Sequence, residues 1–389
     1  MADTETRPDI RSAAETLAIE VAPRAREIED ARRLPADIAN AMAKIGIFRM
    51  VTPAALGGLE LSPREIVETV EILARADAST GWCAMIGATT AMNPAYMAPE
   101  TAREIYGDPM IITGGVFAPM GKATDEGDHY RVTGQWQWGS GSANCTWLCG
   151  GAFITEDGGL RRLPSGAPEN RMMVFPANEA ELLDTWEVMG LKGTGSGDIA
   201  VRDIRVPKAR SVSLVADTPW PDSALYAFPA FGLLALGVSA AALGNARGAL
   251  DAFKTLATRK KNQGSAKTLA ERQVIQAEAA KMEAAWRAAR AYLFDEIDQT
   301  WAVAQSTGEI PMPRRAALRM ACTHMVRTGA DISRTAYDLG GGAALFLSSD
   351  LQRRFRDAHA MTQHIVTAPS TWELTGRILM DLPTDGAMV

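Results

Sequence analysis

The chain has 389 residues, of which 47% are apolar, 22% charged and 6% aromatic. This composition is typical of a globular protein with a large core, and it excludes disordered, collagen-like and disulfide-dense chains. Forty basic and 46 acidic residues give a net charge of −6, which offers no overall attraction to nucleic acid or to an anionic membrane. Four scattered cysteines and the lack of a basic, apolar leader predict a cytoplasmic location.

Residues 1–108 are predicted to form an N-terminal helical domain. Apolar residues recur there at helical spacing, for example at Ile10, Ala14, Leu17 and Val21. The stretch from Ser62 to Glu65, with proline at its second position, has the pattern of a capping box. A helix is therefore expected to begin there.

Residues 109–215 are predicted to form a central β domain, because short apolar runs alternate with glycine, proline and other turn residues. The clearest strand is HYRVTGQWQWGSG, residues 129–141, in which aromatic and polar residues alternate. If this strand continues to its end, Trp136, Trp138 and Ser140 share one face. A hydroxyl group would then lie beside two indole rings.

Residues 223–389 are predicted to form a C-terminal helical bundle, in which a long apolar stripe runs from Ile275 to Ile297. The stretch from Ser223 to Ala246 carries no charge over 24 residues, a length that could also span a membrane. Its proline and glycines among alanines favour a buried helix crossed closely by neighbouring helices. The expectation is therefore a protein without a membrane span.

The loop MGLKGTGSGDIAVRDIRVP, residues 189–207, lacks the spacing of a P-loop or a dinucleotide-binding fingerprint. Taken alone, it favours a glycine-rich turn without a ligand. The alternative is the wall of a ligand site, where backbone amides and the hydroxyls of Thr194 and Ser196 contact a flat or anionic ligand. The sequence shows no metal-ligand spacing and no nucleophile elbow. His364, taken alone, favours a structural role.

Three segments in this order, GQWQWGSGSANCTW, TWEVMGLKGTGSGDIAVRDIRVP and LGGGAALFLSSDLQRRFRDAHAMTQH, resemble the acyl-CoA dehydrogenase superfamily. The resemblance covers nearly the whole chain and implies an α+β, mainly helical flavin fold, usually a homotetramer. It implies that Ser140 hydrogen-bonds the flavin N5 and that Trp138 backs the ring. Further residues implied to contact the flavin are Trp186, Thr194 and Ser196, together with Arg259 as a phosphate ligand donated by a neighbouring subunit.

The C-terminal segment departs from the dehydrogenase pattern, because His364 and Ile365 stand where many dehydrogenases carry their catalytic glutamate. A histidine there is similar to the branch of two-component flavin monooxygenases. That resemblance implies reduced FMN, or alternatively FAD, which reacts with O2 to give a C4a-hydroperoxide. Trp136, Trp138 and Ser140 would exclude water and hold N5, and His364 would act as general base or proton donor. Without a nicotinamide-binding fingerprint, a separate flavin reductase is expected as partner.

Two other functions stay open at the level of the sequence. One is an FAD-dependent acyl-CoA dehydrogenase with an unrecognised base, and the other is a non-catalytic flavin-binding protein. The substrate is expected to be a small organic molecule. In the subgroup that hydroxylates phenols a second histidine is implied after the dipeptide at residues 81–82, and residues 79–97 contain none. This puts a phenol in doubt and leaves a heteroatom or amine target open.

Overall fold

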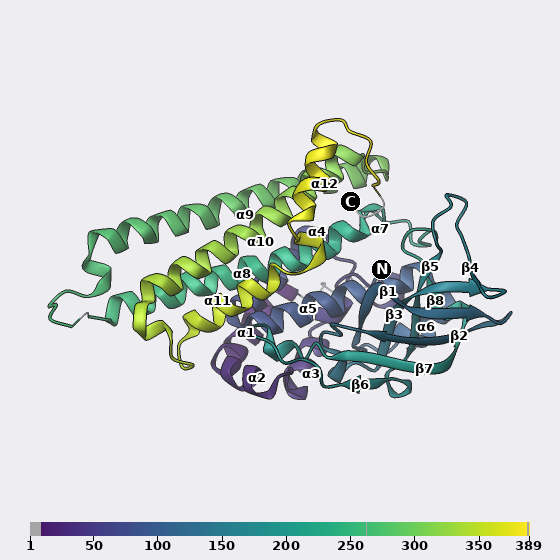
Figure 1. Cartoon of the computed structure of the whole chain (residues 1–389), viewed down its shortest axis with the longest axis horizontal. Helices are drawn as coiled ribbons and strands as arrows, with labels where there is room; N and C mark the ends of the chain where they lie inside the picture. The colour runs from purple at the N-terminus through teal and green to yellow at the C-terminus, as the bar shows by residue number, and fades with distance from the viewer. Residues whose placement is uncertain (1–8, 262, 387–388) are drawn as a thin grey trace, which may run out of the picture.

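The computed structural model describes residues 9–261, 263–386 and 389. It places an N-terminal helical part, a central sheet and a C-terminal set of long helices in that order along the chain (Figure 1). The predicted fold class, α+β and mainly helical, is confirmed. The N-terminal helices are α1 (Ile10–Val21), α2 (Ala25–Ala31), α3 (Ala36–Lys44), α4 (Pro63–Ala76), α5 (Ala78–Thr90) and α6 (Pro99–Tyr106).

Helix α4 starts where its sequence predicts. The backbone N–H of Ser62 donates to the Glu65 carboxylate at 2.9 Å, and the Glu65 N–H donates back to Ser62 Oγ at 3.4 Å. These two bonds satisfy N–H groups that a helix start otherwise leaves without partners. One residue, Asp77, separates α4 from α5 and caps α5 by accepting from the Thr80 N–H at 2.8 Å. The capping fixes the start of α5, which carries Trp82.

Eight strands form one sheet in the order β6-β7-β2-β1-β3-β5-β8, with β4 paired to β3. Strands β1 and β3 are parallel, and every other named pair is antiparallel. The strands are β1 (Thr113–Asp125), β2 (His129–Trp136), β3 (Trp147–Glu156), β4 (Gly159–Leu160), β5 (Asn170–Pro176), β6 (Glu181–Leu183), β7 (Asp198–Pro207) and β8 (Ser211–Val212). The pairing of β2 with β7 brings distant glycine-rich segments together.

Trp136 lies in the core of the sheet and is fully buried. Its indole N–H donates to the carbonyl oxygen of Gly151 at 2.7 Å. A Cβ atom at Gly121, Gly134 or Gly150 would lie within 2.7 Å of the indole ring, so these glycines make room for it. Trp136 is therefore a core residue, and the expectation that it helps to shield the flavin from water is wrong.

Strand β2 ends at Trp136 and does not continue to Ser140. The backbone turns at Trp138, whose φ angle of 68° lies in the left-handed region and outside the range of regular extended strand. The side chain of Trp138 is 60% exposed, whereas Trp136 is buried. The predicted common face of Trp136, Trp138 and Ser140 is therefore wrong, because the alternation of side chains stops where the strand stops.

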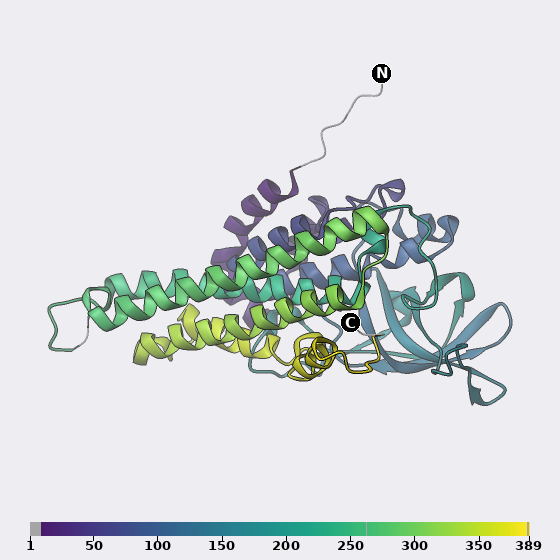
Figure 2. The same cartoon turned by 90° about the horizontal axis from the view of Figure 1, so that it is seen from above.

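The C-terminal helices α8 to α11 lie side by side and extend away from the sheet (Figures 1 and 2). Helix α8 packs against α10 and α11 and also against α4 and α5, so it joins the two helical parts. The set comprises α7 (Ala224–Ala227), α8 (Ala230–Arg259), α9 (Gln273–Thr307), α10 (Met312–Gly340), α11 (Asp350–Met361) and α12 (Ser370–Leu379).

The charge-free stretch after Ser223 is a buried helix, as predicted. Pro229 precedes α8, and the most apolar 18-residue window of this helix is 89% buried. Among the described residues α8 is the one helix long and apolar enough to cross a membrane. Its burial is that of the core helix of a bundle. Its glycines lie close to neighbouring helices of the same chain, for example Gly244, whose Cβ would lie 2.3 Å from the Glu71 carbonyl.

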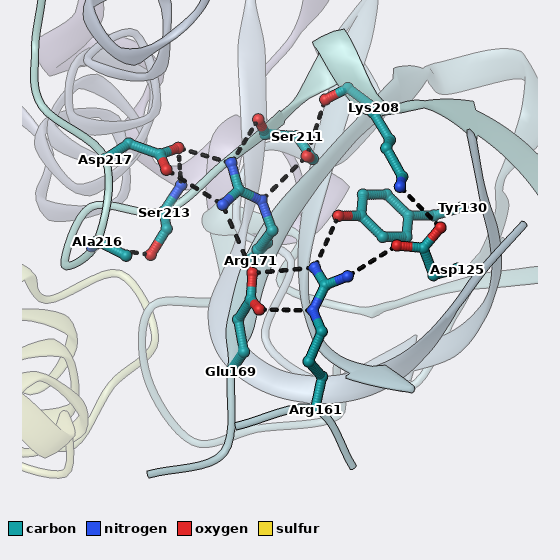
Figure 3. A network of polar contacts seen from close by, with 10 residues as sticks. All are labelled: Asp125, Tyr130, Arg161, Glu169, Arg171, Lys208, Ser211, Ser213, Ala216 and Asp217. Atoms are coloured by element: carbon teal, nitrogen blue, oxygen red, sulfur yellow. Dashed lines mark hydrogen bonds and ion pairs between the residues drawn. The ribbon is translucent and has the colours of Figure 1, made fainter. Parts of the chain in front are cut away.

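A polar network ties the connector after β8 to the sheet (Figure 3). Arg171 donates to both carboxylate oxygens of Asp217, at 3.1 and 2.6 Å, and to Ser211. Arg161 lies across Glu169 from Arg171 and donates to Glu169 and to Asp125, each at 2.7 Å (Figure 3). The network fixes the path of the chain from the sheet to the C-terminal helices.

Candidate functional site

Two backbone segments far apart in sequence lie side by side beyond the ends of β2 and β7. The N–H of Gly139 donates to the Gly197 carbonyl at 2.9 Å, and the N–H of Gly141 donates to the Thr194 carbonyl at 2.8 Å. The antiparallel pairing of β2 with β7 makes this contact, because it sets the two adjoining loops next to each other. Sequence-predicted residues from both loops thus meet in one place.

Three hydroxyl groups from these loops form a continuous buried line. Ser140 Oγ lies 2.6 Å from Ser196 Oγ, and Ser196 Oγ lies 2.6 Å from Thr194 Oγ1. Thr194 Oγ1 donates to the Leu191 carbonyl at 2.7 Å. None of the three hydroxyl residues is more than 5% exposed. Buried hydroxyls persist because each has a partner here.

The carbonyl of Leu191 is a fixed point in this arrangement. It also accepts from the Trp186 indole N–H at 3.0 Å, so the predicted site residue Trp186 joins the same loop. The backbone N–H of Leu191 donates to the Asp357 carboxylate of α11 at 2.6 Å, and Leu191 has a φ angle of 53°. Burial raises the pKa of Asp357 to about 6. Side chains from different parts of the chain thus hold both backbone polar groups of Leu191, which has a left-handed conformation.

The glycines of the 193–197 loop are explained by close contact of the chain with itself. A Cβ at Gly193 would lie 2.3 Å from Ile28, and one at Gly197 would lie 2.3 Å from the Leu183 carbonyl. Gly195 has a φ angle of 55°, which strains most other residues. The expectation that these glycines make room for a phosphate arm is therefore wrong, because the positions of the missing side chains lie against protein atoms.

His364 approaches Ser140 through Trp82 of α5. The indole N–H of Trp82 donates to Ser140 Oγ at 3.1 Å. The rings of Trp82 and His364 meet edge to face, with 5.6 Å between their centroids. Trp82 is therefore the link between the C-terminal helices and the loops of the sheet.

His364 is held as a neutral imidazole. Burial lowers its pKa to about 4, and the positive charge of Arg319 adds to the effect. The N–H of Val366 donates to His364 Nδ1 at 3.4 Å, so Nδ1 carries a lone pair and the proton belongs on Nε2. The imidazole can donate a hydrogen bond from Nε2 to an oxygen. It lacks a free basic nitrogen in this arrangement, which disfavours the general-base role.

A small internal cavity of about 10 Å³ lies next to Ser140 and Gly141. Its other lining includes Cys83, Cys145 and Phe48. The cavity has room for about one water molecule. A ring-shaped ligand would therefore have to reach Ser140 from another direction, such as the side of the exposed Trp138.

Arg259 lies far from this group in the same chain. It is the exposed last residue of α8, whereas Gly237, 22 residues earlier, packs on Met85 of the helix that carries Trp82. At 1.5 Å per helical residue the separation along α8 is roughly 33 Å. Arg259 could therefore reach such a site only in a neighbouring subunit.

Three residues near the site were missed in the sequence. Trp82 was overlooked because its helix was searched only for a histidine. Arg319 and Asp357 are buried charges on α10 and α11, and their partners are backbone groups of Val366 and Leu191. No sequence spacing signals such partners, because any residue can supply a backbone group.

Comparison with known proteins agrees with this fold. Residues 4–111 match the family model described as acyl-CoA dehydrogenase, N-terminal domain, and residues 236–369 match acyl-CoA dehydrogenase, C-terminal domain. The chain is 32% identical over 355 residues to indole-3-acetate monooxygenase of Pseudomonas putida, covering 90% of this chain and 88% of that protein.

A second relative is the oxygenase subunit HsaA, a flavin-dependent monooxygenase of Mycobacterium tuberculosis. The two sequences are 30% identical over 98% of this chain and 97% of HsaA. The crystal structure of HsaA superimposes with a TM-score of 0.88 at 26% identity, covering 98% of this chain and all of that one. The chain therefore belongs to the flavin-dependent monooxygenases, as an oxygenase component built on the acyl-CoA dehydrogenase fold.

Proposed function

We propose that a reduced flavin binds at the loops that carry Trp138, Ser140, Trp186, Thr194 and Ser196, with Ser140 at the flavin N5 and His364 at the reacting oxygen. The contact of Ser140 with Trp82, and of Trp82 with His364, carries the proposal. It joins three distant parts of the chain around one hydroxyl group.

The residues fit a flat ring with a polar edge. Trp138 exposes 60% of its side chain directly beside the buried Ser140, which suits an indole that is covered when a ring system binds. Ser140 offers a hydrogen-bonding oxygen at the same place. A bound reduced flavin supplies the two electrons with which one atom of O2 enters the substrate and the other leaves as water.

His364 would act as a hydrogen-bond donor. Its neutral ring presents an Nε2–H group, because Nδ1 is occupied by the Val366 N–H. Such a donor stabilises negative charge that develops on an oxygen atom. Its low pKa means that the ring stays neutral at physiological pH, so it does not itself lose or gain a proton there.

The substrate would be a small aromatic or heteroaromatic compound. Trp82 supplies an aromatic surface beside His364, and aromatic rings pack favourably edge to face on indoles. The Pseudomonas relative is named an indole-3-acetate monooxygenase, and indole-3-acetate belongs to this class of compound. The expected preference for FMN over FAD stays a prediction, as does a cytoplasmic location.

As an oxygenase component, the protein would receive its reduced flavin from a separate reductase. A homotetramer would let Arg259 of one subunit reach the flavin phosphate of another. This follows from its exposed place at the far end of α8. Sedimentation of the purified protein tests whether it is a tetramer. Arg259→Ala should weaken flavin binding while the tetramer stays intact.

Rapid mixing of the anaerobic protein and reduced FMN or FAD with oxygenated buffer tests the function. The wild type should show a flavin absorbance distinct from both the reduced and oxidised forms, lasting longer than with free flavin. Ser140→Ala should shorten its lifetime, and His364→Ala should release more hydrogen peroxide per O2 consumed. The controls Ser239→Ala and His359→Ala remove a buried hydroxyl and an imidazole elsewhere. Immediate reoxidation by the wild type would contradict the proposal.

A further inference from the structure

The line of hydroxyls behind Ser140 has a direction. A hydroxyl group has one proton to donate and two lone pairs with which to accept. A backbone carbonyl oxygen can only accept. The line ends at such a carbonyl, that of Leu191, so the proton positions along it follow by elimination.

Thr194 donates its single proton to the Leu191 carbonyl at 2.7 Å. Two oxygen atoms at that distance repel each other unless a proton lies between them. Thr194 must therefore accept from Ser196, and Ser196 in turn must accept from Ser140. The Trp82 indole N–H donates to Ser140 as well. Ser140 is left with no proton to offer and one free lone pair.

The end of the line is held firmly. The Leu191 carbonyl accepts from Trp186 as well as from Thr194, and the Leu191 N–H is bonded to the Asp357 carboxylate. The peptide groups on both sides of Leu191 are therefore bonded, so its carbonyl oxygen keeps its direction. The polarity of the hydroxyl line is thus set by the fold and not by the ligand.

The two redox forms of a flavin differ at N5. The oxidised ring has a bare nitrogen there, which can only accept, whereas the reduced ring has an N–H group, which donates. We propose that Thr194 and Ser196, by fixing Ser140 as an acceptor, make this site prefer the reduced flavin over the oxidised one. The proposal rests on the placement of Ser140 at N5 given above.

A bound oxidised flavin would set two acceptors against each other. Facing lone pairs replace a hydrogen bond that either group makes in water, so the oxidised form loses affinity. One such bond corresponds to about a fivefold change in the dissociation constant. An oxygenase that receives reduced flavin and releases oxidised flavin gains from this order of affinities.

Dissociation constants of the two forms test the proposal. Oxidised flavin is titrated in air by its fluorescence, and dithionite-reduced flavin is titrated anaerobically by protein fluorescence. Ser196→Ala frees the Ser140 proton, and Thr194→Val lets Ser196 turn toward Ser140. Each variant should bind oxidised flavin about fivefold more tightly than the wild type does, with reduced flavin changed less than twofold.

Thr194→Ser keeps the donor to Leu191 and should restore the wild-type ratio of the two constants. Thr69→Val is the matched control, because Thr69 is buried and donates only to the Glu65 carbonyl of its own helix at 2.7 Å. It should leave the ratio unchanged. Circular dichroism confirms that each variant is folded before titration.

Two results would overturn the inference. One is that the wild type binds oxidised and reduced flavin with equal affinity. The other is that the ratio of the two dissociation constants in both Ser196→Ala and Thr194→Val lies within twofold of the wild-type ratio. Ser140→Ala separates this failure from failure of the proposed site. If Ser140→Ala alters neither constant, Ser140 does not contact the flavin and the proposed placement is wrong. If Ser140→Ala alters one of the two dissociation constants while Ser196→Ala and Thr194→Val leave their ratio unchanged, Ser140 contacts the flavin and only the role of Thr194 and Ser196 is wrong.

Discussion

Arg319 of α10 donates a hydrogen bond from Nη2 to the carbonyl oxygen of Val366 at 2.8 Å, two residues after His364. The N–H of Val366 donates to the imidazole, so the arginine and the histidine hold the same residue from its two peptide groups. Arg327, two turns further along α10, donates to the carbonyls of Thr362 and Thr367, which flank the turn. Helix α10 thus fixes the segment that presents His364.

Replacing Arg319 by glutamine should raise the pKa of His364. The positive charge of Arg319 disfavours the imidazolium ion, and this is one of the two causes of the low pKa. An NMR titration of labelled histidine measures the change directly, since the chain has four histidines.

Arg327→Gln is the matched control for Arg319→Gln. It loosens the same turn through its bonds to Thr362 and Thr367, but its charge does not contribute to the pKa of His364. The His364 pKa should stay at about 4 in this variant. An equal rise in both variants would show that loosening of the turn, and not charge, controls the imidazole.

His364 should make the protein less stable as the pH falls. Its pKa is about 4 when folded, below the ordinary value of 6.5, so between these values the unfolded chain binds more protons. The free energy of unfolding should therefore fall by up to about 2 kcal/mol from pH 7 to pH 5 through this residue. Asp357, whose pKa is raised to about 6, works in the opposite direction, because its folded form takes up a proton over that range.

Urea unfolding of the wild type and His364→Gln at both pH values isolates the histidine. The stability difference, wild type minus variant, should be larger at pH 7 than at pH 5. For Asp357→Asn the stability difference, wild type minus variant, should be smaller at pH 7 than at pH 5. If the His364→Gln difference is the same at both pH values, the imidazole titrates equally in the folded and unfolded chain.

Substitutions of Trp136 and of Trp138 should have different effects, the first on stability and the second on flavin binding. Trp136→Phe leaves the buried Gly151 carbonyl without its donor and leaves a void among Gly121, Gly134 and Gly150. We expect a loss of about 2 to 4 kcal/mol in unfolding free energy, with unchanged flavin affinity in the folded protein.

Trp138→Phe should do the reverse. The exposed side chain contributes little to folding, within about 0.5 kcal/mol, but its indole is proposed to cover the flavin. Urea unfolding and flavin titration of both variants provide the comparison. Loss of flavin affinity in Trp136→Phe at full stability would contradict the assignment of Trp136 to the core.

Arg171 should hold the connector between the sheet and the C-terminal helices. Arg171→Met removes the bonds to Ser211 and Asp217, so residues 213–222 should become cleavable by protease (Figure 3). Stability should fall by about 1 to 3 kcal/mol because the part-buried Asp217 carboxylate loses its arginine and keeps only the Ser213 N–H as a hydrogen-bond donor among the contacts described.

Arg202→Met is the control for the connector. Arg202 is 80% exposed and lies 3.5 Å from Glu181, an arrangement worth little in stability. Cleavage should remain slow in this variant. Limited proteolysis with mass spectrometry locates the cut, and equal cleavage of both variants would show that Arg171 does not control the connector.

The helices and their order were predictable because their signals are local. Ile10, Ala14, Leu17 and Val21 repeat at helical spacing and are buried together in α1. The capping box at Ser62 needs only residues within one turn. Pattern and structure agree wherever burial of one face decides the conformation.

The segment from Trp136 to Ser140 shows where local patterns fail. Alternating residues predict a strand as long as the alternation lasts, but β2 runs antiparallel to β7 and leaves the sheet opposite Ile199, next to the residue at which β7 begins, Asp198. Trp138 then adopts a left-handed conformation and points elsewhere. The end of a strand depends on its partner strand, which the sequence of the strand does not contain.

By itself the sequence determined the helical and β parts, the buried α8 and the resemblance that marks Ser140 and His364 as candidates. Only the tertiary structure decided that Trp136 belongs to the core, that Trp82 links Ser140 to His364, and that the hydroxyl line ends at the Leu191 carbonyl. The physical reason is that periodicity and capping act over a few residues. Hydrogen-bond direction and ring contacts depend on groups that folding brings together from distant parts of the chain.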